Sequence, residues 1–158
     1  YRTEGLAQTR IYPGVEELLE RLHGAGVRMA VATQKPEPTA ELAVERFGLT
    51  RWFETVSGAA DDAAAAPRDG LAHDKPAIIA EALRRLGVAA PDPARTVMIG
   101  DRRYDAEGAF AHGIDCLGVA WGFADEDELG TGFAAVARDA DELGELLARY
   151  TAPAPTGR

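Results

Sequence analysis

Polar residues follow apolar stretches, or open predicted helices, at three points in the chain. Thr33 follows the apolar stretch "MAVA", Lys75 opens a predicted helix, and Asp101 and Asp105 lie in "GDRRYD" (100–105) after "VMI". A hydroxyl with neighbouring backbone N–H groups can bind phosphate oxygens, and a lysine can neutralise phosphate charge. Paired carboxylates can hold a hard cation such as Mg²⁺. Together these residue types indicate chemistry on a phosphate group.

Each of these residues also has a purely structural interpretation. Thr33 can end a strand, and Lys75 can be a solvated residue at a helix start, although its charge has the wrong sign for the helix dipole there. Asp101 and Asp105 can be helix caps, because aspartate is favoured at helix starts. The combination is more specific than any of its members.

The pattern of apolar residues predicts alternating helices and strands along the chain. The helices are typically closed by glycine, and the strands are short apolar runs without period-two alternation. We predict helices over 13–25, 39–48, 75–87, 104–113 and 139–150, a helical turn over 126–129, a loop over 34–36, and strands over 27–33, 52–58, 96–100, 114–121 and 134–137. This order predicts an α/β fold of three layers, a parallel sheet with helices on both faces. Ligands of such sheets bind beyond the carboxyl ends of the strands.

Length and charge narrow the class of protein further. The 158 residues suffice for one domain, and the formal net charge is −9. Because lysines and arginines are scattered, nucleic acid is not an expected partner. No apolar run approaches the ~20 residues that span a bilayer, so we expect no membrane partner and a cytoplasmic location. The single cysteine, Cys116, lies in an apolar stretch that predicts a buried thiol.

The order of the polar residues resembles that of a known family. Thr33, Lys75 and "GDRRYD", each after a successive strand, resemble the second, third and fourth motifs of the haloacid dehalogenase (HAD) superfamily of phosphohydrolases. Within it, "YPGVEELLERLHGAGVRMAVATQKP" and "VMIGDRRYDAEGAFAHGIDCLGVAWGF" are similar to the phosphoglycolate phosphatase-like group. The resemblance covers residues 11 to 149 and implies a HAD-like, Rossmann-like fold.

The resemblance implies metal-binding and catalytic roles for three residues. Asp101 would be a Mg²⁺ ligand, directly or through water, and Asp105 would support the metal or hold Lys75. Lys75 would neutralise the transferring phosphoryl group and the attacking carboxylate. Mg²⁺ is the cofactor that this family pattern implies.

It implies phosphate-binding roles for residues after the second motif. Thr33 would donate a hydrogen bond to a phosphoryl oxygen, helped by the amide of Gln34. Lys35 would border the substrate, and Lys75 completes this set. The expected catalytic residues are therefore Lys75, Thr33 and Asp101.

The sequence departs from the family at the nucleophile. The family uses Asp-x-Asp-Gly-Thr after its first strand, and residues 1–158 contain no such stretch. We therefore expect the first central strand, between the strands 27–33 and 96–100, and the cap to be missing. Residues 1–10 are interpreted as the end of a cap or linker, 11–150 as an incomplete core domain, and 151–158 as a disordered tail. Little phosphatase activity is expected of these residues alone.

The function expected of the complete protein is Mg²⁺-dependent hydrolysis of a small phosphorylated metabolite through an aspartyl phosphate. The alternative is a catalytically silent HAD-like binding module. A receiver-like signalling domain fits less well, because no aspartate ends a strand before Thr33. The oligomeric state stays open.

Two pairs of residues near the motif have further interpretations. Arg102 and Arg103 can favour an anionic substrate or be solvated loop residues, and the sequence does not decide between these. Trp121 and Phe123 are expected to pack in the core or at its rim rather than to contact substrate.

Overall fold

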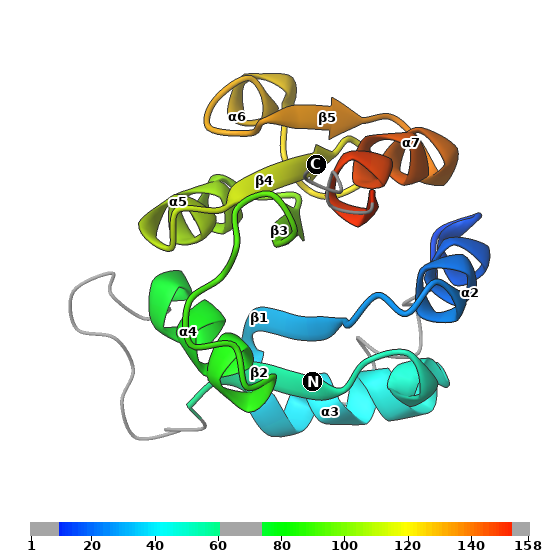
Figure 1. Ribbon diagram of the computed structural model, residues 1–158, viewed down its shortest axis with the longest axis vertical. Coiled ribbons are helices and arrows are strands. Elements are labelled where there is room, and N and C mark those ends of the chain that lie inside the picture. The colour runs from blue at the N-terminus through cyan, green and yellow to red at the C-terminus, as the bar shows by residue number, and fades with distance from the viewer. Residues whose placement is uncertain (1–9, 61–73, 153–158) are drawn as a thin grey trace, which may run out of the picture. The chain divides into compact units, whose positions relative to one another are not determined.

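The computed structural model describes residues 10–60 and 74–152 (Figure 1). The chain forms two compact units, Tyr1–Ala90 and Pro91–Arg158. We call them the N-terminal and C-terminal units and describe each by itself. The expected cap remnant lies outside the described residues except for Arg10, and the expected tail does so beyond position 152. A single core domain over residues 11–150 stays a prediction.

The N-terminal unit is built on two parallel strands that pair directly with each other. Helices α3 and α4 both pack on this strand pair. Buried apolar residues of α4 include Ile78 and Ile79, and the buried Ser57 hydroxyl donates a 3.0 Å hydrogen bond to the carbonyl of Ile78. The elements are α2 (Val15–Gly24), β1 (Ala30–Pro36), α3 (Glu37–Arg46), the 3₁₀ helix η1 (Leu49–Arg51), β2 (Thr55–Ala59) and α4 (Lys75–Arg85).

The end of strand β1 differs from the sequence-based prediction. The predicted loop over residues 34–36 is wrong, because β1 continues to Pro36. The pairing is irregular there: β1 advances from Ala32 to Pro36 while β2 advances only from Ser57 to Ala59. Such a bulge re-aims side chains and often lies beside a functional site. The irregular residues, 33–35, are Thr33 of the second family motif and the two residues that follow it.

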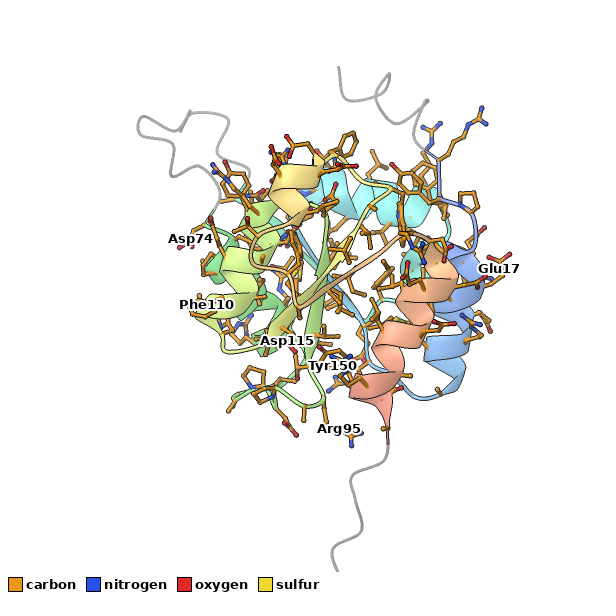
Figure 2. All side chains as sticks on the ribbon, turned by 90° about the horizontal axis from the view of Figure 1, so that it is seen from above. Glu17, Asp74, Arg95, Phe110, Asp115 and Tyr150 are labelled. Atoms are coloured by element: carbon orange, nitrogen blue, oxygen red, sulfur yellow. The ribbon has the colours of Figure 1, made fainter. Side chains whose placement is uncertain are left out.

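The C-terminal unit contains three parallel strands in the order β3, β4, β5. Residues Cys116 to Val119 of the middle strand are all buried, which includes the predicted buried thiol. Helices α5 and α7 lie on opposite sides of these strands (Figure 2). The elements are β3 (Val97–Gly100), α5 (Arg103–Ala111), β4 (Asp115–Val119), α6 (Glu126–Leu129), β5 (Ala135–Ala137) and α7 (Ala140–Thr151).

The observed strands confirm the α/β class and show only part of a sheet. Among the described residues, β1 pairs with β2, and β3 pairs with β4. Ile99 of β3 is 39% exposed, whereas Leu117 beside it on β4 is fully buried. Exposed apolar residues on a parallel strand are unusual, so this pattern is consistent with the missing first strand predicted from the sequence. In the same described residues no helix has the length and apolar character to cross a membrane.

The end of α7 is attached to the start of β4 by one buried polar contact. The hydroxyl of Tyr150 donates a 2.7 Å hydrogen bond to the carboxylate of Asp115 (Figure 2). Burial, and then this contact with Asp115, raises the pKa of Tyr150 to about 12. An unfolded tyrosine has a pKa of about 10. Folding therefore favours the protonated hydroxyl.

Replacing Tyr150 with phenylalanine should change how stability depends on alkaline pH. Because the pKa of Tyr150 is raised on folding, its stabilisation is complete below pH about 10 and is lost as pH rises through about 12. Y150F should cost about 1–3 kcal/mol at pH 7, since Asp115 loses its donor. Urea unfolding from pH 7 to 12 should show this difference shrinking above pH 10.

The difference in free energy of unfolding between wild type and Y150F at pH 7 to 9, below the range in which Tyr150 titrates, is the reference for this measurement. A Y150F difference that stays constant from pH 9 to 12 contradicts the assignment.

Candidate active site

The expected phosphate-binding residues lie in the bulge of β1. Thr33 Oγ1 accepts a 3.3 Å hydrogen bond from the backbone N–H of Lys35. This contact uses the threonine oxygen as an acceptor, so the hydroxyl hydrogen can be donated to another oxygen. Gln34 lies between these two residues, in the same bulge. The structure thus brings Thr33, Gln34 and Lys35 into one short irregular segment.

Lys75 contacts β1 next to the bulge, although 43 residues separate it from its partner there. It is the first residue of α4 and is only 5% exposed. Its Nζ donates a 2.6 Å hydrogen bond to the carbonyl of Ala32, the residue before Thr33. A buried ammonium group needs such partners, because desolvation of an unpaired charge is costly. This contact explains why a lysine stands where the helix dipole disfavours a positive charge.

A network that sequence reasoning missed holds the segment after the bulge. Glu37 Oε2 accepts the backbone N–H of Gly58 at 3.0 Å, and Arg85 Nη2 donates to Glu37 Oε1 at 3.0 Å. Arg85 Nη1 also donates to the carbonyl of Val56 at 2.6 Å. The N–H of Gly58, followed by Arg85, holds the pKa of Glu37 below its usual value. Its partners lie 21 and 48 residues away, so no local pattern could have revealed it.

The turn between β3 and α5 is organised by Asp105. Asp105 Oδ2 accepts the backbone N–H groups of Asp101 at 3.0 Å and Arg102 at 3.1 Å. Arg102 is the N-cap of α5, and Asp105 is the third residue of the helix. The structural interpretation of Asp105 as a capping residue is therefore correct, whereas Asp101 precedes the N-cap. We call residues 101–105 the acidic turn.

Asp101 is held by the segment that follows β4. Its Oδ2 accepts a 2.7 Å hydrogen bond from the backbone N–H of Phe123. Two glycines permit the close packing around the acidic turn. A Cβ atom on Gly122 would overlap the side chain of Asp101, and one on Gly100 would overlap that of Asp105. The need for glycine at 122 arises from the packing of the segment after β4 against Asp101, which no local sequence pattern reveals.

Aromatic and basic residues lie within and beside the acidic turn. Phe123 is 86% exposed, so the expectation that it packs in the core or at its rim is wrong. Arg102 Nε donates to Glu128 Oε1 at 2.9 Å, and Arg103 Nη2 donates to the hydroxyl of Tyr104 at 3.1 Å. Arg102 is thus an ion-pair partner, which neither sequence interpretation included.

The carboxylates of the acidic turn have the chemistry that Mg²⁺ requires. Mg²⁺ prefers oxygen ligands, retains several waters and is commonly bound by one or two carboxylates. The hydrogen bond from Phe123 uses Oδ2 of Asp101, and the other oxygen can bind a cation. Within residues 10–60 and 74–152, no group of three or more His, Cys, Asp or Glu side chains could hold a metal.

The parallel strands and their polar carboxyl ends define an α/β protein of the doubly wound type. The chain belongs to the haloacid dehalogenase-like hydrolase family, whose model matches residues 1–113.

Curated relatives differ in the activities that their names state. Tyrosine-protein kinase PtkA of Mycobacterium tuberculosis is 40% identical over 150 residues, which cover 93% of this chain and 48% of the relative. A 5'-nucleotidase of Pseudomonas aeruginosa is 37% identical, covering 82% of this chain and 54% of the relative. A phosphoglycolate phosphatase of Agrobacterium fabrum is 35% identical, covering 79% and 49%. The chain spans about half the length of these relatives.

Solved structures agree with the fold. A predicted phosphatase from Clostridium acetobutylicum matches with a TM-score of 0.80 and 29% identity, covering 92% of this chain and 63% of that one. The structure of PtkA from Mycobacterium tuberculosis matches with a TM-score of 0.73 and 40% identity, covering 93% and 65%. Both confirm the HAD-like fold predicted from the sequence.

Substitution of Gly122 tests how closely the segment after β4 approaches Asp101. G122A should lower the free energy of unfolding by about 1–3 kcal/mol, because the added methyl group overlaps the Asp101 side chain. G130A is the matched control, since a Cβ there would lie 3.4 Å from the carbonyl of Glu126, an ordinary contact. It should change stability by less than about 0.5 kcal/mol. Equal urea midpoints for the two variants would refute the proposed close approach.

Proposed function

We propose that the protein containing this chain is a Mg²⁺-dependent phosphatase of small phosphorylated metabolites. The observation that carries the proposal is the buried Lys75 ammonium, hydrogen-bonded to the carbonyl of Ala32 in β1, directly before Thr33. A buried cation next to a hydroxyl suits a phosphoryl dianion. Family membership and the names of two relatives, a 5'-nucleotidase and a phosphoglycolate phosphatase, support the same chemistry.

The proposed roles follow from the chemistry of each group. Thr33 and the amide of Gln34 bind phosphoryl oxygens, Lys75 neutralises their charge, and Lys35 borders the substrate. Asp101 and Asp105 provide oxygen atoms for Mg²⁺. When bound, Mg²⁺ offsets the negative charge that phosphoryl transfer brings together.

Hydrolysis proceeds in two proposed steps. An aspartate carboxylate attacks phosphorus, the ester P–O bond breaks, and the alcohol leaves with a proton supplied by a general acid. Water, losing a proton to the same group now acting as a base, then attacks the phosphorus of the aspartyl phosphate; the P–O bond to the aspartate breaks, inorganic phosphate leaves and the carboxylate is restored. The attacking aspartate is proposed to lie outside these 158 residues, which contain no Asp-x-Asp-Gly-Thr stretch and span about half of the relatives.

A second candidate is phosphoryl transfer from a nucleotide to a protein tyrosine. The observation in its favour is the 40% identity to PtkA, which is named as a tyrosine-protein kinase. The same phosphate-binding groups would serve either reaction, because both transfer a phosphoryl group, although the donor and the final acceptor differ. The third possibility is the silent binding module, which would transfer no phosphoryl group.

Activity of the full gene product separates these candidates. With Mg²⁺ and a panel of phosphomonoesters, the phosphatase releases inorganic phosphate, and chelation of the metal abolishes this release. With γ-labelled ATP and a tyrosine peptide, a kinase labels the peptide instead. A folded protein that gives neither product is the silent module.

Substitutions at Lys75 and Asp101 should reduce phosphate release without unfolding the protein. K75M and D101N should each lower kcat/KM by about 100-fold or more, since each removes a group that stabilises charge on the phosphoryl oxygens. K75R keeps the charge and tests whether K75M has simply lost its fold. D92N is the matched control, because Asp92 accepts the N–H of Ala94 in an exposed turn. Wild-type rates in K75M would contradict the proposed site.

A further inference from the structure

Two helices of the C-terminal unit begin with nearly the same sequence. Helix α6 starts in "DEDELG" and α7 in "DADELG". Asp125 Oδ1 accepts the N–H of Glu128 at 2.8 Å, and Asp139 Oδ1 accepts the N–H of Glu142 at 2.8 Å. Both aspartates are therefore N-caps, and both glutamates occupy the third helical position. Because the two helix starts are so similar, the directions of their glutamate side chains can be compared within one protein.

The two glutamates contact different parts of the chain. Glu142 Oε2 accepts the backbone N–H of Arg138 at 2.7 Å and its Nε at 2.9 Å, so its carboxylate returns to the start of its own helix. Glu128 Oε1 instead accepts the backbone N–H of Arg103 at 2.7 Å and the Nε of Arg102 at 2.9 Å. Its partners lie 25 and 26 residues earlier, in the acidic turn.

The position of Glu128 is unusual for its sequence pattern. A glutamate three residues after an N-cap normally reaches back to the backbone before its own helix. Glu128 is directed to another helix, and its side chain is 16% exposed, against 30% for Glu142. The N–H of Arg103 is one of the first four amides of α5, which have no partner within that helix. Glu128 therefore caps α5 rather than α6.

We propose that Glu128 is a positioning residue that holds the acidic turn in its cation-binding conformation. Together with the Phe123 amide on Asp101, it attaches the segment after β4 to the turn at two points. This inference rests on the proposed function for the identity of the cation, Mg²⁺. The contacts between Glu128 and the turn do not depend on it.

The charge of Glu128 gives the contact a second effect. Its carboxylate pairs with the Arg102 guanidinium, which also interacts electrostatically with Asp101. Without Glu128, Arg102 can pair with Asp101 and compete with a cation for the same carboxylate. Removing groups that orient metal ligands typically weakens metal affinity 10- to 100-fold.

The test compares E128A and E128Q with E142A in the full gene product. Hydrogen exchange is measured on the amides of Asp101 and Arg102 in metal-free protein, because these amides bond to Asp105 and not to Glu128. Both should exchange at least about tenfold faster in E128A. Calorimetric titration should show Mg²⁺ binding weakened about 10- to 100-fold in E128A and less in E128Q.

The control variant is E142A, and two results would contradict a proposal. E142A removes a carboxylate with matching partners elsewhere in the unit, and it should leave both readouts within about twofold of wild type. If E128A fails to fold, E128Q decides, since glutamine keeps the size but not the ion pair. Unchanged exchange at both amides in a folded Glu128 variant overturns the inference. Wild-type protein that binds no Mg²⁺ while E128A still exchanges faster refutes the proposed metal instead.

Discussion

Asp105 accepts the backbone N–H groups of Asp101 and Arg102 through one carboxylate oxygen, and the C-terminal unit is organised around these two hydrogen bonds. They end β3, start α5 and fix the direction in which Asp101 leaves the strand. The turn is so tight that Gly100 has no room for a side chain. Asp105, which caps α5, thereby also orients Asp101, a candidate metal ligand.

In the N-terminal unit, different side chains satisfy the backbone groups beside the bulge. No aspartate caps a helix at its bulge. Instead, the Glu37 carboxylate accepts a hydrogen bond from the N–H of Gly58, and the Lys75 ammonium donates one to the carbonyl of Ala32. In both units, charged side chains satisfy backbone groups in or next to a strand. These side chains come from neighbouring or distant elements. Backbone groups left without partners in such places would cost free energy, so these contacts stabilise the fold while arranging polar groups for a ligand.

Family membership leaves the acceptor of the phosphoryl group open, and the relatives show why. Proteins named as a kinase, a nucleotidase and a phosphoglycolate phosphatase share this part of their sequence with the chain. The matched half contains groups suited to phosphate and metal, which any phosphoryl transfer requires. Fold and family membership alone do not specify the substrate.

Local sequence determined the helices and strands, because apolar spacing, aspartate caps and closing glycines act over only a few residues. It also pointed to Thr33, Lys75, Asp101 and Asp105 by their types and order. Tertiary structure alone decided that residues 33–35 form a bulge within β1, that Phe123 is exposed, and that Glu128 caps α5 instead of α6. Each of these depends on pairing or hydrogen bonding between elements distant in the sequence. "DEDELG" and "DADELG" begin their helices alike, and only the neighbours that folding brings to them make their glutamates differ.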